Sequence, residues 1–199
     1  MTCTLVPINL ASPTEAEELR QQRLVCGWHK TPDVFASWHD KQVAGLKSFF
    51  WITVTKGSES IRAGHISLDA YADPADSELA NSDKTNLTIQ TFFILPQHRS
   101  GGLGSAAMRM IEALAPKEPF GSPNCEFITL NTMSKKHYYD EELGPILRPT
   151  MPICNQEWYE RQGYVVWKEE PRYEDTLPDG RAFVWTSAFM RKRIADISV

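Results

Sequence analysis

The alternation of apolar and polar residues divides the chain into short strands and helices. Helical signals begin at Ser12 and Thr31, each followed by a proline that suits the first helical position. The patterns predict helices at 12–25, 31–46, 105–115 and 153–162. Aromatic and β-branched runs predict strands at 4–8, 48–55, 61–71, 87–95, 125–132, 164–170 and 182–194.

The order of these elements indicates the class of fold. Some neighbouring strands are joined by turns alone, whereas others are separated by helices, which argues against a purely parallel sheet. We expect an α/β (α+β) fold with a mixed, mostly antiparallel sheet and helices on both faces. The chain has 199 residues, 42% of them hydrophobic. This length suits one core, so we expect a single domain over 1–199.

Composition excludes several classes of partner. The net charge is −4 and the isoelectric point about 5.8, so we expect no nucleic-acid partner. No secretory signal and no long apolar run is visible, so we expect a cytoplasmic protein without a membrane partner. The four cysteines form no C-x-x-C pair and no zinc-site spacing. We therefore expect no metal and interpret them as free thiols, with a single nucleophilic cysteine as the alternative.

The stretch "PQHRSGGLGS", 96–105, lies between a predicted strand and a predicted helix. The first N–H groups of a helix have no intrahelical partner, and the helix dipole adds positive charge there. Glycines allow an anion to approach the backbone, and Arg99 adds a full charge. The stretch therefore predicts a phosphate site, with close packing of the helix start as the alternative. It fits neither the P-loop nor the dinucleotide pattern.

The spacing Arg99, Gly102, Gly104 fits Arg-x-x-Gly-x-Gly and follows "FFILP". It resembles the acyl-CoA-binding motif of the GNAT superfamily of N-acetyltransferases, in which a bulged strand leads into a pyrophosphate loop and a helix. A second stretch, "WYERQGYVVW" at 158–167, resembles the later motif of that family. The resemblance covers about 48–193, and before that it is topological only. The chain departs from the family at Ser100 and Gly101, where a basic residue is usual, and in a longer connection at 132–152.

The resemblance implies a GNAT fold with acetyl-CoA as cosubstrate. It assigns the strand, loop and helix at 86–115 to the cofactor. The main-chain N–H groups of Phe93 and Ile94 would then polarise the thioester and hold the pantetheine. The pyrophosphate would contact the loop that follows, at Arg99, Ser100, Gly101, Gly102, Leu103, Gly104 and Ser105.

The resemblance also suggests proton carriers for the reaction. Tyr159 matches the tyrosine that often acts as general acid, with a core aromatic that packs on the cofactor as the alternative. A base is less evident, because Gln90 and Thr91 stand where some members carry a glutamate. Asp69 is the nearest strand carboxylate, with His65 on the same strand face. An exposed hairpin charge, a water-relayed base or no dedicated base are the alternatives.

The variable region 1–47 corresponds to the part of the family that lines the acceptor pocket. Trp28, His29 and Trp38 lie there, and Tyr138 lies in the long connection, as candidate substrate-binding residues. We expect the primary amine of a small molecule as acceptor. The alternatives are a protein lysine or N-terminal amine, or a CoA-binding domain without catalysis. Exposed final strands in such folds often pair, so we keep a homodimer open.

Overall fold

The computed structural model describes residues 2–149, 151–177 and 180–197, which form two compact units. The first unit consists of the chain up to Ile128 and the segment that begins at Ile194. The second unit is Thr129–Arg193. The strand order is β1-β2-β3-β4-β6-β8-β7, with β5 paired to β3. This arrangement confirms the predicted mixed, mostly antiparallel sheet.

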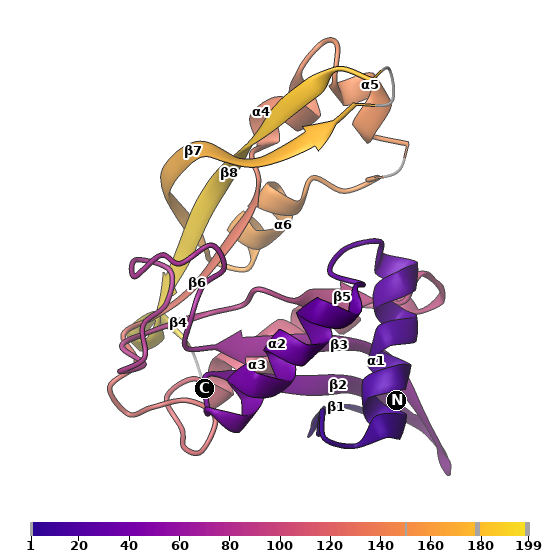
Figure 1. Cartoon of the computed structure of the whole chain (residues 1–199), viewed down its shortest axis with the longest axis vertical. Helices are drawn as coiled ribbons and strands as arrows, with labels where there is room; N and C mark the ends of the chain where they lie inside the picture. Colours follow the sequence, from indigo (N-terminus) through magenta and orange to yellow (C-terminus); the bar gives the residue numbers. More distant parts are fainter. Residues whose placement is uncertain (1, 150, 178–179, 198–199) are drawn as a thin grey trace. The chain divides into compact units, whose positions relative to one another are not determined.

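The elements follow the predicted order (Figure 1). The strands are β1 Thr2–Pro7, β2 Lys47–Lys56, β3 Glu59–Asp69, β4 Asn86–Thr88, β5 Phe92–Ile94, β6 Phe127–Met133, β7 Val165–Thr176 and β8 Ala182–Arg193. The helices are α1 Pro13–Cys26, α2 Pro32–Val43, α3 Leu103–Leu114, α4 Lys135–Tyr139, α5 Gly144–Leu147 and α6 Asn155–Arg161, with short 3-10 turns at Pro96–His98 and Ile194–Asp196.

Helices cover both faces of the sheet in the first unit. Side chains alternate between the two faces of a strand, and Phe49 and Trp51 of β2 pack in one core cluster with Leu19 of α1 and Trp38 of α2. Figure 1 shows α1 and α2 in front of β2 and β3. The buried side of α3 packs toward β1 and β3 and includes Ala107, Met108 and Ile111.

Two local predictions are corrected by the structure. The single strand predicted over 87–95 is interrupted at 89–91, which separates β4 from β5. The connection 132–152 was predicted to be irregular, but it contains the end of β6 and the short helices α4 and α5. Residue 150 of that connection lies outside the described residues. Periodicity cannot detect helices of four or five residues, because they complete little more than one turn.

The second unit is built on a long hairpin. β7 and β8 pair antiparallel from Val165 and Arg191 to Thr176 and Ala182, with irregular register at Val166 and Pro171. β8 also neighbours β6 in the sheet. Both strands of the hairpin run over twelve residues, so β7 is longer than the predicted strand 164–170.

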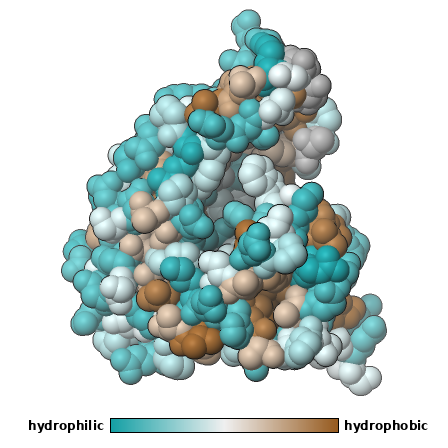
Figure 2. Space-filling model, viewed as in Figure 1, coloured by the Kyte–Doolittle hydropathy of each residue, from teal (hydrophilic) through white to brown (hydrophobic). Residues whose placement is uncertain are grey.

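On the face in Figure 2, apolar residues form small groups separated by polar ones. Within the described ranges, no helix has the length and apolar character needed to cross a bilayer. The four cysteines form no disulfide, and Cys3 and Cys26 are only partly buried. The described residues contain no group of three or more metal-ligating side chains arranged to bind an ion.

Candidate active site

A β-bulge interrupts the segment that leads into the glycine-rich turn. Thr88 of β4 pairs with Asp69 of β3. Further along, Phe92 of β5 pairs with Ile66. The chain advances by four residues from Thr88 to Phe92, whereas β3 advances by three between their partners. One extra residue therefore lies between β4 and β5. The bulge that the resemblance implied is present in the structure.

The bulge leaves one main-chain edge of β5 facing away from β3. The Leu95 N–H donates to Ala63 O at 2.9 Å, and the Ser67 N–H donates to Thr91 O at 2.8 Å. In an antiparallel pair, every second residue of a strand forms main-chain hydrogen bonds with the partner strand. The N–H and C=O of Phe93 therefore point toward β3, whereas those of Ile94 point away from it. The N–H of Ile94 therefore has the orientation needed to bind a ligand. The role expected for the Phe93 N–H does not fit this geometry.

The Ile94 carbonyl and the Arg99 side chain are held together. Arg99 Nε donates to Ile94 O at 2.9 Å, and the guanidinium carbon lies 5.4 Å from the centre of the Phe93 ring. The cation thus lies against β5, although the residue remains exposed. It keeps a positive charge beside the outward edge of this strand.

The turn before α3 presents several free N–H groups. Gly102 and Ser100 have positive φ angles of 74° and 71°. The first bond of the helix runs from Ala106 N to Gly102 O, at 3.0 Å. Within the described part of the chain, no acceptor binds the N–H groups of 100–105. The residues of the turn, 99–102, are exposed, so it has the composition and the free donors of an anion site.

Gly64 of β3 is required for the close approach of β5, which gives a testable prediction. A Cβ at Gly64 would lie 2.2 Å from Phe93 O and 2.9 Å from Ile94 Cα. Both atoms are backbone, so Gly64→Ala must push β5 away from β3. If the cosubstrate is acetyl-CoA, as the sequence resemblance implies, we expect this variant to bind it about tenfold more weakly in calorimetry. Gly57→Ala, in an open turn, is the control, and equal affinities in the two variants would contradict the prediction.

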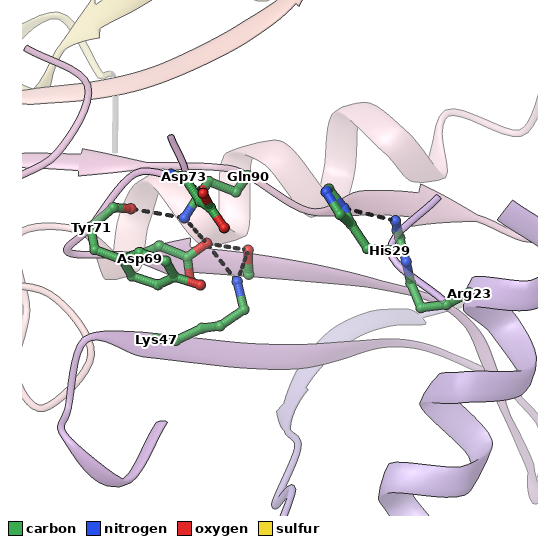
Figure 3. Close-up of polar contacts among 8 residues, drawn as sticks. Arg23, His29, Lys47, Asp69, Tyr71, Asp73 and Gln90 are labelled. Atoms are coloured by element: carbon green, nitrogen blue, oxygen red, sulfur yellow. Dashed lines mark hydrogen bonds and ion pairs between the residues drawn. The ribbon is translucent and has the colours of Figure 1, made fainter. Parts of the chain in front are cut away.

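A buried ion pair joins the neighbouring strands β2 and β3. Lys47 Nζ lies 2.8 Å from Asp69 Oδ2, and the two residues are 2% and 0% exposed. Ser67 Oγ and Gln90 Nε2 also donate to Asp69 Oδ2, at 2.7 and 3.2 Å. Figure 3 shows Lys47 and Gln90 on either side of this carboxylate. Asp69 Oδ1 is buried and has no hydrogen-bond partner in the described part of the chain. Asp69 is therefore not the exposed hairpin charge that one alternative anticipated.

Burial and pairing act on this carboxylate in opposite directions. Burial raises the pKa of Asp69, while Lys47, Ser67 and Gln90 act to lower it. Burial likewise lowers the pKa of Lys47, and the charge of Asp69 opposes that change. The ammonium also lies 4.3 Å from the centre of the Phe49 ring. The ion pair is therefore enclosed by aromatic and hydrogen-bonding groups.

A second buried polar cluster lies on the same face of β3. Arg23 of α1 is 3% exposed and contacts His65 and His29. His65 is fully buried, and its Nδ1 lies 2.8 Å from Gln22 Oε1. Burial, followed by the charges of Arg23 and Lys47, lowers the pKa of His65 well below its usual value. His65 is therefore a neutral imidazole in the folded protein.

The predicted acceptor residues have different environments. Trp28 is 58% exposed, and it lies with His29 in the turn between α1 and α2. Trp38 belongs to the core cluster of α2 and β2, where only 7% of it is exposed. Tyr138 is buried in α4 of the second unit, where its carbonyl accepts from Arg148 Nη1 at 3.1 Å. The rings of His29 and Trp38 are in contact, with centroids 5.8 Å apart, and Trp28 directly precedes His29 in the turn.

Tyr159 lies on α6 of the second unit. Its ring contacts those of Trp158 and Tyr164, with centroids 5.0 and 6.0 Å away. Burial raises the pKa of Tyr159, so the phenol stays protonated at neutral pH. The side chain can therefore donate a proton but not accept one.

Sequence reasoning missed four residues that organise the first unit. Gln22 and Arg23 lie on a predicted helix and Lys47 stands at the start of a predicted strand, and polar residues at such positions usually face solvent. Gly64 sits inside a strand, which is a known indication of close backbone approach. His65, Ser67 and Asp69 alternate along the strand and so lie on one face of it. This pattern could have indicated that polar side chains gather on that face.

The sequence profile of the Acetyltransferase (GNAT) family matches residues 9–144, which is more than half of the chain. This protein belongs to that family. The GNAT resemblance of the sequence motifs is thereby confirmed, and the protein is an enzyme, an N-acetyltransferase. A search among curated proteins finds no match to this GNAT chain.

Solved structures share the GNAT fold along the whole chain. An aminoglycoside 6'-N-acetyltransferase complexed with coenzyme A is 14% identical, with a TM-score of 0.60 and coverage of 98% of this chain and 97% of that one. A spermidine N-acetyltransferase SpeG chimera from Vibrio cholerae and hSSAT is 12% identical, with a TM-score of 0.61 and coverage of 99% and 98%. Arabidopsis thaliana Naa50 in complex with the bisubstrate analogue CoA-Ac-MVNAL is 12% identical, with a TM-score of 0.56 and coverage of 96% and 99%. At these identities the likeness shows the fold alone.

Proposed function

We propose that the whole chain is one N-acetyltransferase domain that transfers the acetyl group of acetyl-CoA to the primary amine of a small molecule. The observation that carries the proposal is the bulge between β4 and β5, followed by the exposed turn with free N–H groups before α3. These features provide donors both for a thioester carbonyl and for a pyrophosphate.

The cosubstrate would lie along the outward edge of β5 and across the turn. The Ile94 N–H donates to the thioester carbonyl and so favours the oxyanion of the tetrahedral intermediate. The N–H groups of 100–105 bind the pyrophosphate, and Ser105 Oγ adds a further donor. A similar fold is known with coenzyme A bound, which supports this assignment.

The amine must lose a proton before its lone pair attacks the thioester carbon. Asp69 remains our candidate base, and Oδ1 is the atom with spare acceptor capacity, because Oδ2 already accepts three hydrogen bonds. Its enclosed position means that a proton reaches it through a bridging water or after a local movement. Collapse of the intermediate breaks the C–S bond, and Tyr159, assigned by the family motif, protonates the leaving thiolate.

A small-molecule acceptor is supported by the residues of the first unit. Trp28 and His29 provide an exposed aromatic wall in the turn between α1 and α2, beside the largely buried Trp38. Similar folds act on an aminoglycoside and on spermidine, which favours a small amine. The rival is a protein or peptide acceptor, favoured by the fold shared with the enzyme that holds CoA-Ac-MVNAL.

Turnover assays with Tyr159→Phe test this proposal. Wild-type protein is incubated with acetyl-CoA and a panel of polyamines, aminoglycosides, amino acids and peptides, and released CoA is measured. We expect turnover with a small amine, and we expect Tyr159→Phe to lower kcat about 100-fold, the usual range for a lost general acid. The KM for acetyl-CoA should stay unchanged, because the phenol is assigned to the leaving group.

Tyr173→Phe is the matched control, since this tyrosine binds Asn131 in the same unit. Acetylation of peptides alone would favour the protein-acceptor rival. Binding of acetyl-CoA without any turnover would favour a CoA-binding domain without catalysis. An equal kcat in wild type and Tyr159→Phe would remove Tyr159 from the mechanism.

A further inference from the structure

Arg23 is a buried cation whose three polar side-chain contacts are all with uncharged groups. Its Nε donates to Trp28 O at 3.0 Å, its Nη1 lies 3.4 Å from His65 Nε2, and its Nη2 lies 3.4 Å from His29 Nδ1. Figure 3 shows the last of these contacts. In the part of the chain that the structure describes, no carboxylate forms an ion pair with Arg23. The guanidinium therefore has neutral acceptors only.

The chemistry of the guanidinium fixes the state of both imidazoles. A guanidinium has only donors, so each ring nitrogen that faces it must be an unprotonated acceptor. His65 Nδ1 then carries the proton and donates to Gln22 Oε1 at 2.8 Å. The Gln22 amide is itself oriented by the bond from its Nε2 to Arg62 O, at 3.2 Å. Both histidines are neutral and leave the charge of Arg23 uncompensated.

An uncompensated buried charge is costly to keep. Lys47, on the same face of the sheet, is balanced by Asp69 at 2.8 Å, whereas Arg23 is not. Among the described residues, the buried charged groups on this face are thus two cations, Arg23 and Lys47, and one anion, Asp69. Leaving a charge buried without a counter-charge destabilises a fold by several kcal/mol, so its presence at a candidate site indicates a ligand of opposite sign.

The position of Arg23 places this charge beside the proposed acetyl site. The His65 ring lies 5.7 Å from that of Phe93 on β5, and Arg23 contacts the same imidazole. The guanidinium contacts Trp28 O and His29 Nδ1 of the turn 27–31, all of whose residues are exposed. Two of them have positive φ, Gly27 at 88° and His29 at 50°. Movement of this short turn would uncover the guanidinium.

The electrostatic environment at the turn favours an anion. Partial burial, then the charges of Arg23 and Lys47, lower the pKa of His29, and the opposing effect of Asp73 is smaller. The local potential at His29 is therefore positive. A cationic group on an acceptor would be repelled there, whereas a carboxylate would be attracted.

We infer that Arg23 binds a carboxylate of the acceptor, so that the acceptor is an amino acid or a similar small amine that also carries a carboxylate. This inference rests on the proposed function of the same site. The carboxylate replaces Trp28 O and His29 Nδ1 as partner of the guanidinium, while the amine of the same molecule faces β5. Arg is suited to this role because its planar fork matches a carboxylate.

Matched acceptors test the inference in the wild-type enzyme. Each amino acid is compared with its amide and with the amine that remains after removal of its carboxylate. We expect kcat/KM to be about 10- to 100-fold higher for the amino acid, the range for a hydrogen bond to a charged group. Equal kcat/KM values across the three members of each set would overturn the inference and leave the proposed function intact.

Variants of α1 test whether Arg23 causes the preference for acceptors that carry a carboxylate. In Arg23→Gln the ratio of kcat/KM for an amino acid to that for its amide should fall to near one, and the KM for acetyl-CoA should stay unchanged. Arg23→Lys should keep part of the preference. Arg20→Gln is the matched control on the same helix, because the Arg20 side chain is partly exposed and pairs with Glu17 at 2.7 Å. A preference that persists in Arg23→Gln contradicts our assignment.

Binding measurements separate this inference from the proposed function. Calorimetry with N-acetyl amino acids, the expected products, and with their amides needs no turnover. Binding of the acids alone, lost in Arg23→Gln, would support the carboxylate site even if no amine were acetylated. If the wild type binds acids and amides equally, or neither, Arg23 only anchors the turn between α1 and α2, and the inference is wrong.

Discussion

Lys47→Met is expected to lower the free energy of unfolding by about 3–5 kcal/mol, the cost of leaving a buried carboxylate without its partner. Asp69 would lose the ammonium at 2.8 Å and keep only the hydrogen bonds from Ser67 and Gln90. Urea unfolding at pH 7.5 measures this change. Lys56→Met, at the exposed other end of β2, is the control and should cost less than about 0.5 kcal/mol.

The stability that Lys47→Met loses relative to the wild type should depend on pH. Burial already raises the pKa of Asp69, and removal of Lys47 raises it further. A carboxyl whose folded pKa exceeds its unfolded value stabilises the fold most below the unfolded pKa, and this contribution is lost as pH rises through the folded pKa. The deficit of Lys47→Met should therefore shrink on acidification toward pH 5. Lys47→Met/Asp69→Leu should recover much of the stability, and a deficit equal at pH 5 and 8 would argue against a buried charge.

Gly102→Glu is expected to abolish the stabilisation of the protein by acetyl-CoA. At a hundred times its dissociation constant, a ligand adds roughly 2.7 kcal/mol, or about 5–10 °C in Tm for a chain of this size. A Cβ at Gly102 meets no atom within 4 Å, so the new carboxylate adds charge without a clash. It would face the N–H groups that are proposed to bind the pyrophosphate. Thermal unfolding with and without millimolar acetyl-CoA measures the effect.

The control for this charge is Gly102→Ala. Because φ is 74° at this position, either side chain costs about 1 kcal/mol of backbone strain. The two variants should therefore have similar Tm values without ligand, and Gly102→Ala should keep its response to acetyl-CoA. If both variants respond like the wild type, the turn does not bind the pyrophosphate.

The sequence predicted the larger helices and strands and the order in which they occur. The helices that begin after Ser12 and Thr31 start at the expected residues, because proline restricts where a helix begins. The family motif around Arg99 led to the correct family, because its chemistry depends on glycine positions that are visible in a sequence.

The buried polar groups could not be predicted in the same way. A lysine at the start of a strand or an arginine on an amphipathic helix usually faces solvent, and only tertiary packing decides otherwise. The pairing of Lys47 with Asp69 depends on the register of β2 and β3, which shifts by one residue between Ile52 and Thr53. The break in the predicted strand 87–95 was also hidden, since an extra residue in a bulge leaves the hydrophobic pattern almost unchanged.

The outward edge of β5 has a consequence for how this enzyme tolerates mutation. The donor proposed at Ile94 belongs to the peptide backbone, so replacing the side chain leaves that hydrogen atom in place. Alanine scanning would therefore pass over the group that is closest to the chemistry, whereas a small change at Gly64 on the neighbouring strand would displace it. Such a site can drift widely in sequence while the path of its main chain is conserved.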